Sequence, residues 1–188
     1  MTECERIIKE GILPESFFKP ETICDFYVDE TRKKIWAVEI DLYLTLAEVC
    51  EKHDLKLFTD GGTTLGAIRH KGFIPWDDDL DVCLLREDYE KLKLLTAEFN
   101  HPYFLQNSDT DPEYAFSFMK LCNSNTAYDV RPFTHAKFNH GIHIDIFPID
   151  KVTQDDYIPR RQKIADIIAI NSAYMRKDLP EKTDSDKE

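Results

Sequence analysis

The stretch that decides the fold is FTDGGTTLGAIRHKGFIPWDDDLDVCLL, residues 58–85. Apolar residues before it extend its start into a short strand over 55–59. Gly61 and Gly62 then supply a tight turn, since glycine adopts backbone conformations that other residues avoid. Residues 80–85 read as a second, buried strand. An acidic run thus stands at the entrance to a buried strand, where carboxylates are costly without a ligand.

Four aspartates fall within five positions of this run: Asp77, Asp78, Asp79 and Asp81. Their charges repel one another and raise one another's pKa values unless a cation offsets them. Side chains two apart on a strand share a face, so Asp79 and Asp81 point the same way. All-oxygen ligation favours Mg²⁺ or Mn²⁺ over zinc. We therefore expect Asp79 and Asp81 to bind a divalent cation, with Asp77, Asp78 and Trp76 in supporting positions.

A third carboxylate lies in the motif GIHIDIFP, residues 141–148. Isoleucines alternate there with His143 and Asp145, so these two side chains share the face opposite an apolar one. If this strand lies beside the strand over 80–85, Asp145 joins the two aspartates as a catalytic carboxylate and metal ligand. His143 is expected to support the site.

Phosphate groups need hydrogen-bond donors as well as a metal. The glycine turn opens a short helix over 63–69, and the N–H groups at a helix N-terminus form an anion site. Three adjacent cationic or polar side chains follow in an otherwise acidic protein, and such groups pair with phosphate. The residues expected to bind donor phosphates are Gly61, Gly62, Thr63, Arg69, His70 and Lys71.

Other interpretations of these residues stay open at this point. The acidic run could be a solvated turn, and the basic triplet could be ordinary surface. Asp77, Asp79 and Asp81 also match the first ligand positions of an EF-hand, but Val82 occupies the position where that loop requires glycine. His140 and His143 could bind zinc, although no third nitrogen or sulfur ligand is near them in the sequence.

The rest of the chain alternates helices with short strands. The elements expected outside the central stretch are helices over 30–53, 87–99 and 155–175, strands over 103–106, 114–121, 126–130 and 142–147, and irregular segments over 1–30 and 131–140. In the first of these helices, Asp41 is expected on the outer side. The mixed order predicts an α+β fold. We expect a single domain over residues 1–175 and a flexible charged tail over 176–188.

The composition excludes several classes of protein. The 188 residues carry a net charge of −12, which repels nucleic-acid phosphates and argues against a polynucleotide partner. No stretch is long and apolar enough to be a transmembrane segment, and the acidic N-terminus is unlike a signal peptide. The five cysteines form no CxxC pair, and Cys50 and Cys83 lie in apolar segments. We therefore expect free thiols and a reducing, cytoplasmic setting.

The segment DGGTTLGAIRHKGFIPWDDDLDVCLLREDYEKL, residues 60–92, resembles the signature of the LicD family. The segment GIHIDIFPID, residues 141–150, resembles a second motif of the same family. LicD proteins, and the similar fukutin-related ribitol-phosphate transferases, are phosphotransferases that decorate glycans such as lipopolysaccharide. The resemblance covers residues 26–150, roughly two thirds of the chain.

The resemblance implies a nucleotidyltransferase-like fold, with a mixed β-sheet flanked by helices. In that fold a glycine-rich turn precedes two carboxylates on one strand and a third on a neighbouring strand. It also implies a Mg²⁺-dependent enzyme that moves a phospho-alcohol group, phosphocholine above all, from a CDP-linked donor such as CDP-choline to a glycan hydroxyl, with release of CMP. A choline headgroup favours an aromatic cage. The aromatic residues near the motifs are Trp36, Phe73, Trp76, Tyr128 and Phe133.

The chain departs from the family pattern at three places. Thr64 stands where leucine is commoner, and His143 stands where an apolar residue is usual. The chain is also short for the family after Asp150, which is consistent with a C-terminal truncation. Two other functions stay open: a nucleotidyltransferase that moves a nucleoside monophosphate from a nucleoside triphosphate and releases pyrophosphate, and a catalytically impaired module that binds a nucleotide or a glycan-modifying enzyme.

Overall fold

The computed structural model describes residues 1–114, 116–128 and 137–153, together with Pro159, Arg161 and Lys163. The chain divides into two compact units. The first comprises Met1–Tyr128 and Phe138–Asp150, and the second comprises Asp129–Lys137 and Lys151–Glu188. The helix expected over 155–175 and the tail over 176–188 lie almost wholly outside the described residues. The single domain over 1–175 stays a prediction.

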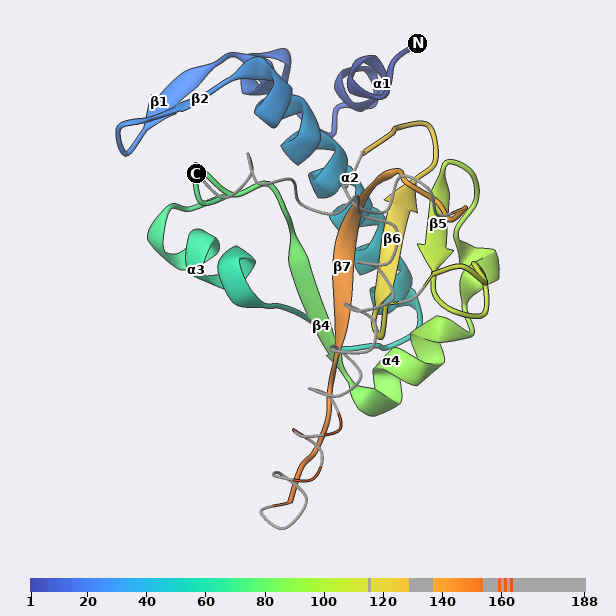
Figure 1. The fold of residues 1–188 in the computed structure, drawn as a ribbon. Coiled ribbons are helices and arrows are strands. Elements are labelled where there is room, and N and C mark those ends of the chain that lie inside the picture. The colour runs from blue at the N-terminus through green and yellow to red at the C-terminus, as the bar shows by residue number, and fades with distance from the viewer. Residues whose placement is uncertain (115, 129–136, 154–158, 160, 162, 164–188) are drawn as a thin grey trace, which may run out of the picture. The chain divides into compact units, whose positions relative to one another are not determined.

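Five strands form a mixed sheet in the first unit, in the order β3-β4-β7-β6-β5 (Figure 1). The strands are β3 (Leu57–Thr59), β4 (Asp81–Leu85), β5 (Tyr103–Gln106), β6 (Met119–Asn123) and β7 (Ile142–Ile149). β4 and β7 run parallel, and the other neighbouring strands pair antiparallel. The expected mixed β-sheet flanked by helices is confirmed.

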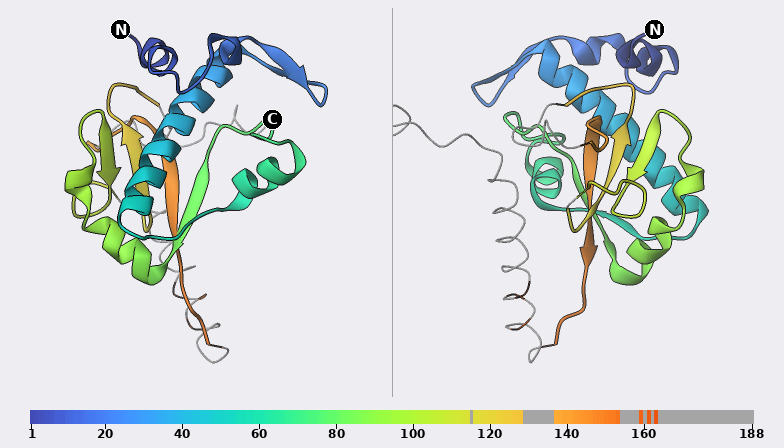
Figure 2. Two further views of the ribbon diagram at one scale, coloured as in Figure 1. Left: turned by 180° about the vertical axis from the view of Figure 1, so that it is seen from behind. Right: turned by 45° about the vertical axis from the view of Figure 1, so that its right-hand side comes forward.

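The long helix α2 (Glu30–Lys52) covers one face of this sheet (Figure 2, left). Asp29 caps the helix, because its side chain accepts a hydrogen bond from the Arg32 N–H group. The apolar stripe of α2 packs on the inward side chains of the central strands. The core residues at this contact are Ala37, Val38, Leu42, Leu46, Val82, Leu84, Met119, Leu121, Ile144 and Ile146. Because side chains alternate along a strand, the polar residues of these strands lie on the other face.

Asp41 does not lie on the outer side of α2, so that prediction is wrong. Helix α1 (Glu3–Lys9) packs against α2, and Asp41 is only 2% exposed. Arg6 of α1 forms an ion pair with Asp41, and the Tyr103 hydroxyl donates a hydrogen bond to the same carboxylate at 3.0 Å. A buried carboxylate is tolerated when it is paired in this way.

The segment before α2 is more regular than expected. Besides α1 it holds a 3-10 helix, η1 (Glu15–Phe18), and a hairpin of β1 (Glu21–Ile23) and β2 (Phe26–Val28). The hairpin turns at Cys24 and Asp25, whose φ angles are both positive, at 50° and 61°. Asn-Gly or Asp-Gly usually marks such a two-residue turn, and the Cys-Asp pair lacks this signal.

Two predictions downstream of β4 are corrected. The helix expected over 87–99 ends early, because α4 spans Arg86–Lys93 and a separate 3-10 turn, η2, spans Thr96–Glu98. The strand pair expected over 114–121 and 126–130 is not found among the described residues of these segments. Only β6 is a strand in the described part of that region, and its partners are β5 and β7.

Among the described residues, no helix has the length and apolar character needed to cross a membrane. Cys50 and Cys83 are buried free thiols, as the sequence predicts. The cytoplasmic location inferred from such thiols stays a prediction.

Candidate active site

Three strands bring two carboxylates and a lysine side by side on the polar face of the sheet. Asp81 of β4 lies opposite Asp145 of β7 in the strand register. Lys120 of β6 lies opposite Asp145 on its other side. The Asp145 N–H group also donates to the Leu80 carbonyl at 3.0 Å, at the point where the two strands begin to pair. The adjacency of Asp145 and Asp81, on which the sequence prediction depended, is confirmed.

The loop that carries the other aspartates is held by α2. The Asp77 carbonyl accepts hydrogen bonds from the Arg32 guanidinium at 2.7 Å and from the Trp36 indole at 3.0 Å. The Trp36 ring stacks in turn on the Phe73 ring, with 4.7 Å between the centroids. The acidic loop, residues 77–79, is therefore anchored through a backbone atom at its first residue.

Gly61 and Gly62 pass directly beside the carboxylates. Helix α3 (Gly61–Arg69) begins at Gly61, whose φ of +49° lies in the region that favours glycine. A Cβ atom added to Gly61 would come within 3.2 Å of Asp81 Oδ2. A Cβ atom added to Gly62 would come within 2.6 Å of Asp77 Oδ2. The N-terminus of α3 and the acidic loop therefore approach each other more closely than side chains at these positions would permit.

The crowding of negative charge raises the pKa values of two aspartates. Burial, followed by the charges of Asp79 and Asp145, raises the pKa of Asp81 to about 7. Burial, followed by a hydrogen bond and charge interaction with Asp77, raises the pKa of Asp79 to about 6. The raised pKa values show that ionisation of one carboxyl makes ionisation of its neighbours unfavourable. A cation bound between them would favour the ionised form and lower these pKa values.

Lys120 and His143 flank Asp145 on the polar face. The Lys120 ammonium lies 2.7 Å from His143 Nε2 and 3.4 Å from Asp145 Oδ1. Asp145 Oδ1 is buried and forms no hydrogen bond with the described residues, because its contact with Lys120 lacks hydrogen-bond geometry. Burial, followed by the charge of Lys120, lowers the pKa of His143. His143, predicted to support the site, is thus a neutral neighbour of Lys120.

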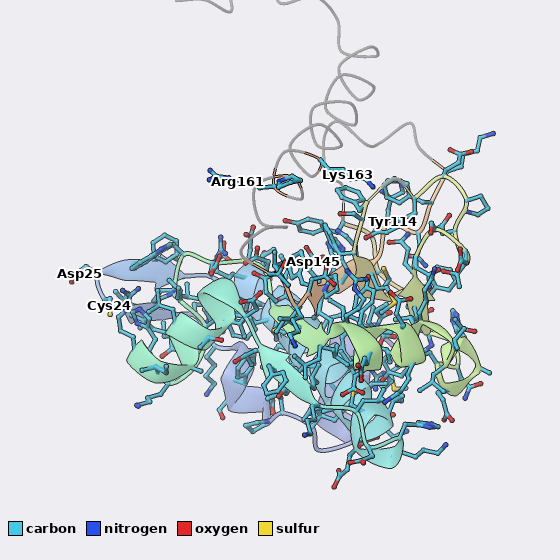
Figure 3. All side chains as sticks on the ribbon, turned by 90° about the horizontal axis from the view of Figure 1, so that it is seen from below. Cys24, Asp25, Tyr114, Asp145, Arg161 and Lys163 are labelled. Carbon is cyan, nitrogen blue, oxygen red and sulfur yellow. The ribbon has the colours of Figure 1, made fainter. Side chains whose placement is uncertain are left out.

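Tyr114 lies on the same side of the sheet as Asp145 (Figure 3). Its ring is 3% exposed, and its hydroxyl has no hydrogen-bond partner among the described residues. Burial, followed by the negative charge of Asp145, raises the pKa of Tyr114. A neutral phenol and a carboxylate oxygen without a hydrogen bond to the described residues therefore occupy the same region of the polar face.

A cavity of about 620 Å³ is lined by residues of α2, α3 and the acidic loop. Among the predicted site residues, its wall contains Gly62, Thr63, His70, Lys71, Asp77 and Asp79. The Thr63 hydroxyl also accepts a hydrogen bond from the Asp81 N–H group at 2.8 Å, which joins α3 to β4. Arg69 is not part of the wall, and its guanidinium donates to His70 Nε2 at 2.9 Å. The structure thus gathers most of the predicted phosphate-binding residues around one cavity, and their role stays a prediction.

Trp76 and Asp78 lie at the edge of this site. The Trp76 side chain is 52% exposed, and its ring contacts the rings of Phe26 and His70 edge-on, at 6.2 and 6.0 Å. The Asp78 carboxylate accepts a hydrogen bond from the Tyr128 hydroxyl at 3.4 Å. Both residues are therefore in positions that connect the acidic loop to neighbouring segments.

Sequence reasoning missed Lys120 and Glu39. Lys120 lies beside Asp145 because β6 pairs with β7, and local sequence patterns do not show that pairing. Glu39 is 1% exposed within the apolar stripe of α2. A charged residue is almost never fully buried unless it is paired, so its position in that stripe was a usable signal.

The donor set suits a divalent cation. In the part of the chain that the structure describes, no three histidine, cysteine or acidic side chains converge closely enough to enclose a metal ion. The zinc interpretation of His140 and His143 therefore has no support. Mg²⁺, however, is usually bound by one or two carboxylates, with water and substrate phosphates completing its shell. Asp81 and Asp145, on neighbouring strands, fit that mode of binding.

The EF-hand interpretation is wrong, because Asp81 begins a strand rather than continuing a calcium-binding loop. The solvated-turn interpretation also fails in part, since the turn is anchored by α2 and lies against α3. The geometry that remains is a pair of carboxylates on neighbouring strands, close to a helix N-terminus and a cavity.

Residues 54–167 match the model of the LicD/FKTN/FKRP nucleotidyltransferase domain. The chain belongs to this family. It is similar to lipopolysaccharide cholinephosphotransferase LicD of Haemophilus influenzae, with 33% identity over 113 residues. It is also similar to human ribitol 5-phosphate transferase FKRP, with 26% identity over 120 residues, and to an uncharacterized protein of Rickettsia prowazekii, with 42% identity over 52 residues.

The chain matches only part of each relative. The aligned stretch is 58% of this chain and 41% of the Haemophilus protein, and 62% of this chain and 22% of the human protein. For the Rickettsia protein the shares are 28% and 20%. The region that matches the family therefore includes the strands and turns that form the site. The activity of the longer relatives comes to this chain only as a proposal.

Proposed function

We propose that this chain transfers a phospho-alcohol group from a CDP-linked donor to a hydroxyl group of a glycan, with release of CMP. The observation that carries the proposal is the pairing of β4 and β7, which sets Asp81 beside Asp145 within reach of the α3 N-terminus. Phosphoryl transfer depends mainly on positioning and on stabilising charge, and carboxylates beside an anion site supply both. The names of the Haemophilus and human relatives, both transferases of substituted phosphate groups, support the same reaction class.

Asp81 and Asp145 would hold a divalent cation, Mg²⁺ or Mn²⁺, directly, and Asp79 of the acidic loop would reach it through water bound to the ion. When bound there, the cation neutralises the negative charge that develops on the leaving nucleotide. The chain's own contribution is to keep these oxygen donors close together against their mutual repulsion, through the strand register and the anchored loop.

The N-terminus of α3 is proposed to bind the donor's phosphate groups. The first N–H groups of a helix have no partner within the helix, and Gly62 and Thr63 belong to this first turn. Gly62 leaves room for the approach, because no side chain separates its backbone from the acidic loop. His70 and Lys71 stand on the wall of the same cavity and would add donors to the phosphate oxygens.

Asp145 is proposed to orient the acceptor hydroxyl and to accept its proton. Its Oδ1 atom is free of hydrogen bonds with the described residues, and an acceptor must be within hydrogen-bond reach of the proton it takes. Lys120, 3.4 Å away, balances the negative charge of Asp145 before the donor binds. The acceptor proton would therefore pass to Asp145 while the oxygen attacks the distal phosphorus.

Phosphocholine is the group that we propose first, and its support comes from the Haemophilus relative's name. Two of the aromatic residues considered for a choline cage, Trp36 and Phe73, line the cavity. The Lys33 ammonium already lies 5.3 Å from the centre of the Trp36 ring, so this ring has a cation on it. Phe133 lies outside the described residues. Lipopolysaccharide is the acceptor proposed, on the same relative's name.

The test is to incubate the chain with CDP-choline, other CDP-alcohols and nucleoside triphosphates, each with Mg²⁺ and a lipopolysaccharide acceptor. We expect CMP from a CDP-alcohol, and no CMP from the Asp145→Asn variant. Pyrophosphate from a nucleoside triphosphate would instead identify a nucleotidyltransferase. Stabilisation by a donor without turnover across the acceptors would identify a binding module, and either result would overturn the proposal.

A further inference from the structure

Glu39 is a buried carboxyl group that the fold does not pair. It lies in the middle of α2 and is 1% exposed. Its Oε2 atom has no hydrogen-bond partner among the described residues. Burying a carboxylate without a partner costs several kcal/mol in typical proteins, roughly 2–7 kcal/mol even for an uncharged polar group. A bound ligand that interacts with the buried Glu39 carboxyl would offset this cost.

The face of α2 that carries Glu39 points to the acidic loop. Arg32, Trp36 and Glu39 are spaced by four and three residues, so they follow one another along a single face of the helix. The first two of these side chains bind the Asp77 carbonyl. Burial, followed by the charges of Asp79, Asp78 and Asp77, raises the pKa of Glu39 well above its usual value. The unpartnered carboxyl therefore lies near the loop's aspartates.

We propose that Glu39 takes part in binding the divalent cation of the active site, by accepting hydrogen bonds from water held on that cation. The proposal rests on the function proposed above and extends its cation site from β4 and β7 to α2. Since no three described acidic side chains enclose an ion, a cation here keeps several water molecules. Those waters need acceptors, and the Glu39 carboxyl, on the face of α2 that holds the acidic loop, provides one.

The competing explanation is a carboxyl group that is merely tolerated in the core. In that case Glu39 remains protonated whatever the cation concentration, and its replacement affects the fold alone. If Glu39 accepts hydrogen bonds from water on the cation, its replacement lowers the affinity of the protein for the cation. The metal-free fold is then as stable as before or more stable. The two explanations therefore differ in the affinity for the metal, measured without any turnover.

The experiment compares wild-type protein with Glu39→Gln and with Glu48→Gln. Glu48 lies on the same helix and is exposed, so this variant is the matched control for the loss of one acidic charge. Mn²⁺ is titrated into each metal-free protein, and free Mn²⁺ is followed by electron paramagnetic resonance. Removing groups that support metal ligands typically weakens affinity about 10- to 100-fold, and we expect this for Glu39→Gln with no change for Glu48→Gln.

Thermal unfolding in EDTA separates binding from folding. We expect Glu39→Gln, and Glu39→Met as a second variant without a polar group, to unfold in EDTA at or above the wild-type temperature. Unfolding of both variants at lower temperature would overturn the proposal, because Glu39 would then serve the fold without a cation. A wild-type Mn²⁺ affinity in Glu39→Gln, or no Mn²⁺ binding by the wild type, would overturn it as well.

The outcome for Glu39 is separable from that for the proposed reaction. CMP release by the wild type, together with unchanged Mn²⁺ affinity in Glu39→Gln, would remove Glu39 from the site and leave the transferase. Weakened Mn²⁺ binding in that variant, together with no CMP from any donor, would support the role of Glu39 and overturn the transferase.

Discussion

Replacing Asp81 with asparagine is expected to stabilise the metal-free protein while it abolishes transfer. Burial, followed by the charges of Asp79 and Asp145, raises the pKa of the Asp81 carboxyl from 3.8 to about 7. A shift of that size corresponds to about 4 kcal/mol. Because Asp81 is partly exposed and water screens its charge, we expect about 1–2 kcal/mol of stabilisation in Asp81→Asn. For a chain of this length the melting temperature should rise by about 2–8 °C.

The sign of the pH dependence follows from the raised pKa. Well below the ordinary pKa of 3.8, the carboxyl is protonated in both the folded and the unfolded chain, so it costs no stability there. As the pH rises to about 7, the unfolded chain releases the proton more readily, and the wild type loses stability relative to the variant. Above that pH the difference between the two proteins should be constant.

The assay is calorimetric unfolding of wild type and Asp81→Asn in EDTA, from pH 4 to pH 8. The difference between the two melting temperatures is the quantity of interest, because the other titrating groups are common to both proteins. A difference that does not change with pH would refute the electrostatic reasoning. A variant less stable than wild type at every pH would refute it too.

Two further substitutions test the surroundings of these carboxylates. Gly62→Ala places a Cβ atom 2.6 Å from Asp77 Oδ2, so we expect a loss of about 1–3 kcal/mol in unfolding free energy and weaker donor binding. The Cβ atom of Gly72→Ala meets nothing within 4 Å, so this variant should keep the wild-type stability. Equal melting temperatures for the two alanine variants would contradict the close approach of α3. Lys120→Met leaves Asp145 without its cationic neighbour, so the metal-free protein should lose about 1–3 kcal/mol and Mn²⁺ should stabilise it more than it stabilises wild type. An unchanged response of the melting temperature to Mn²⁺ would show that Lys120 does not balance Asp145.

The periodicity of the apolar residues was sufficient to predict the helix and the strands that carry the carboxylates. The helix predicted over 30–53 is α2 at Glu30–Lys52, and the strands predicted over 80–85 and 142–147 are β4 and β7. These segments have long or strictly alternating apolar patterns, so burial decides their conformation. The alternation also placed Asp81 and Asp145 on the polar side of their strands.

The pairing of strands that are far apart in the chain could not be predicted from the sequence. β6 was assigned a hairpin partner after its Asn-rich turn, whereas its partners in the sheet are β5 and β7. Lys120 owes its place beside Asp145 to that pairing, so local patterns could not identify it. Asp41 was misplaced for a related reason, because its burial depends on α1 docking against α2. Local propensity is overridden wherever such tertiary contacts decide the outcome.

The two hydrogen bonds from α2 to the acidic loop end on the Asp77 carbonyl, which every amino acid possesses. Side-chain changes at positions 77–79 therefore leave the anchor in place. The loop's path and its charge can vary independently in this fold, so one aspartate of the loop can be replaced without rebuilding the backbone around it. For the same reason, aspartate-to-asparagine exchanges in this loop report on charge with little contribution from displaced main chain.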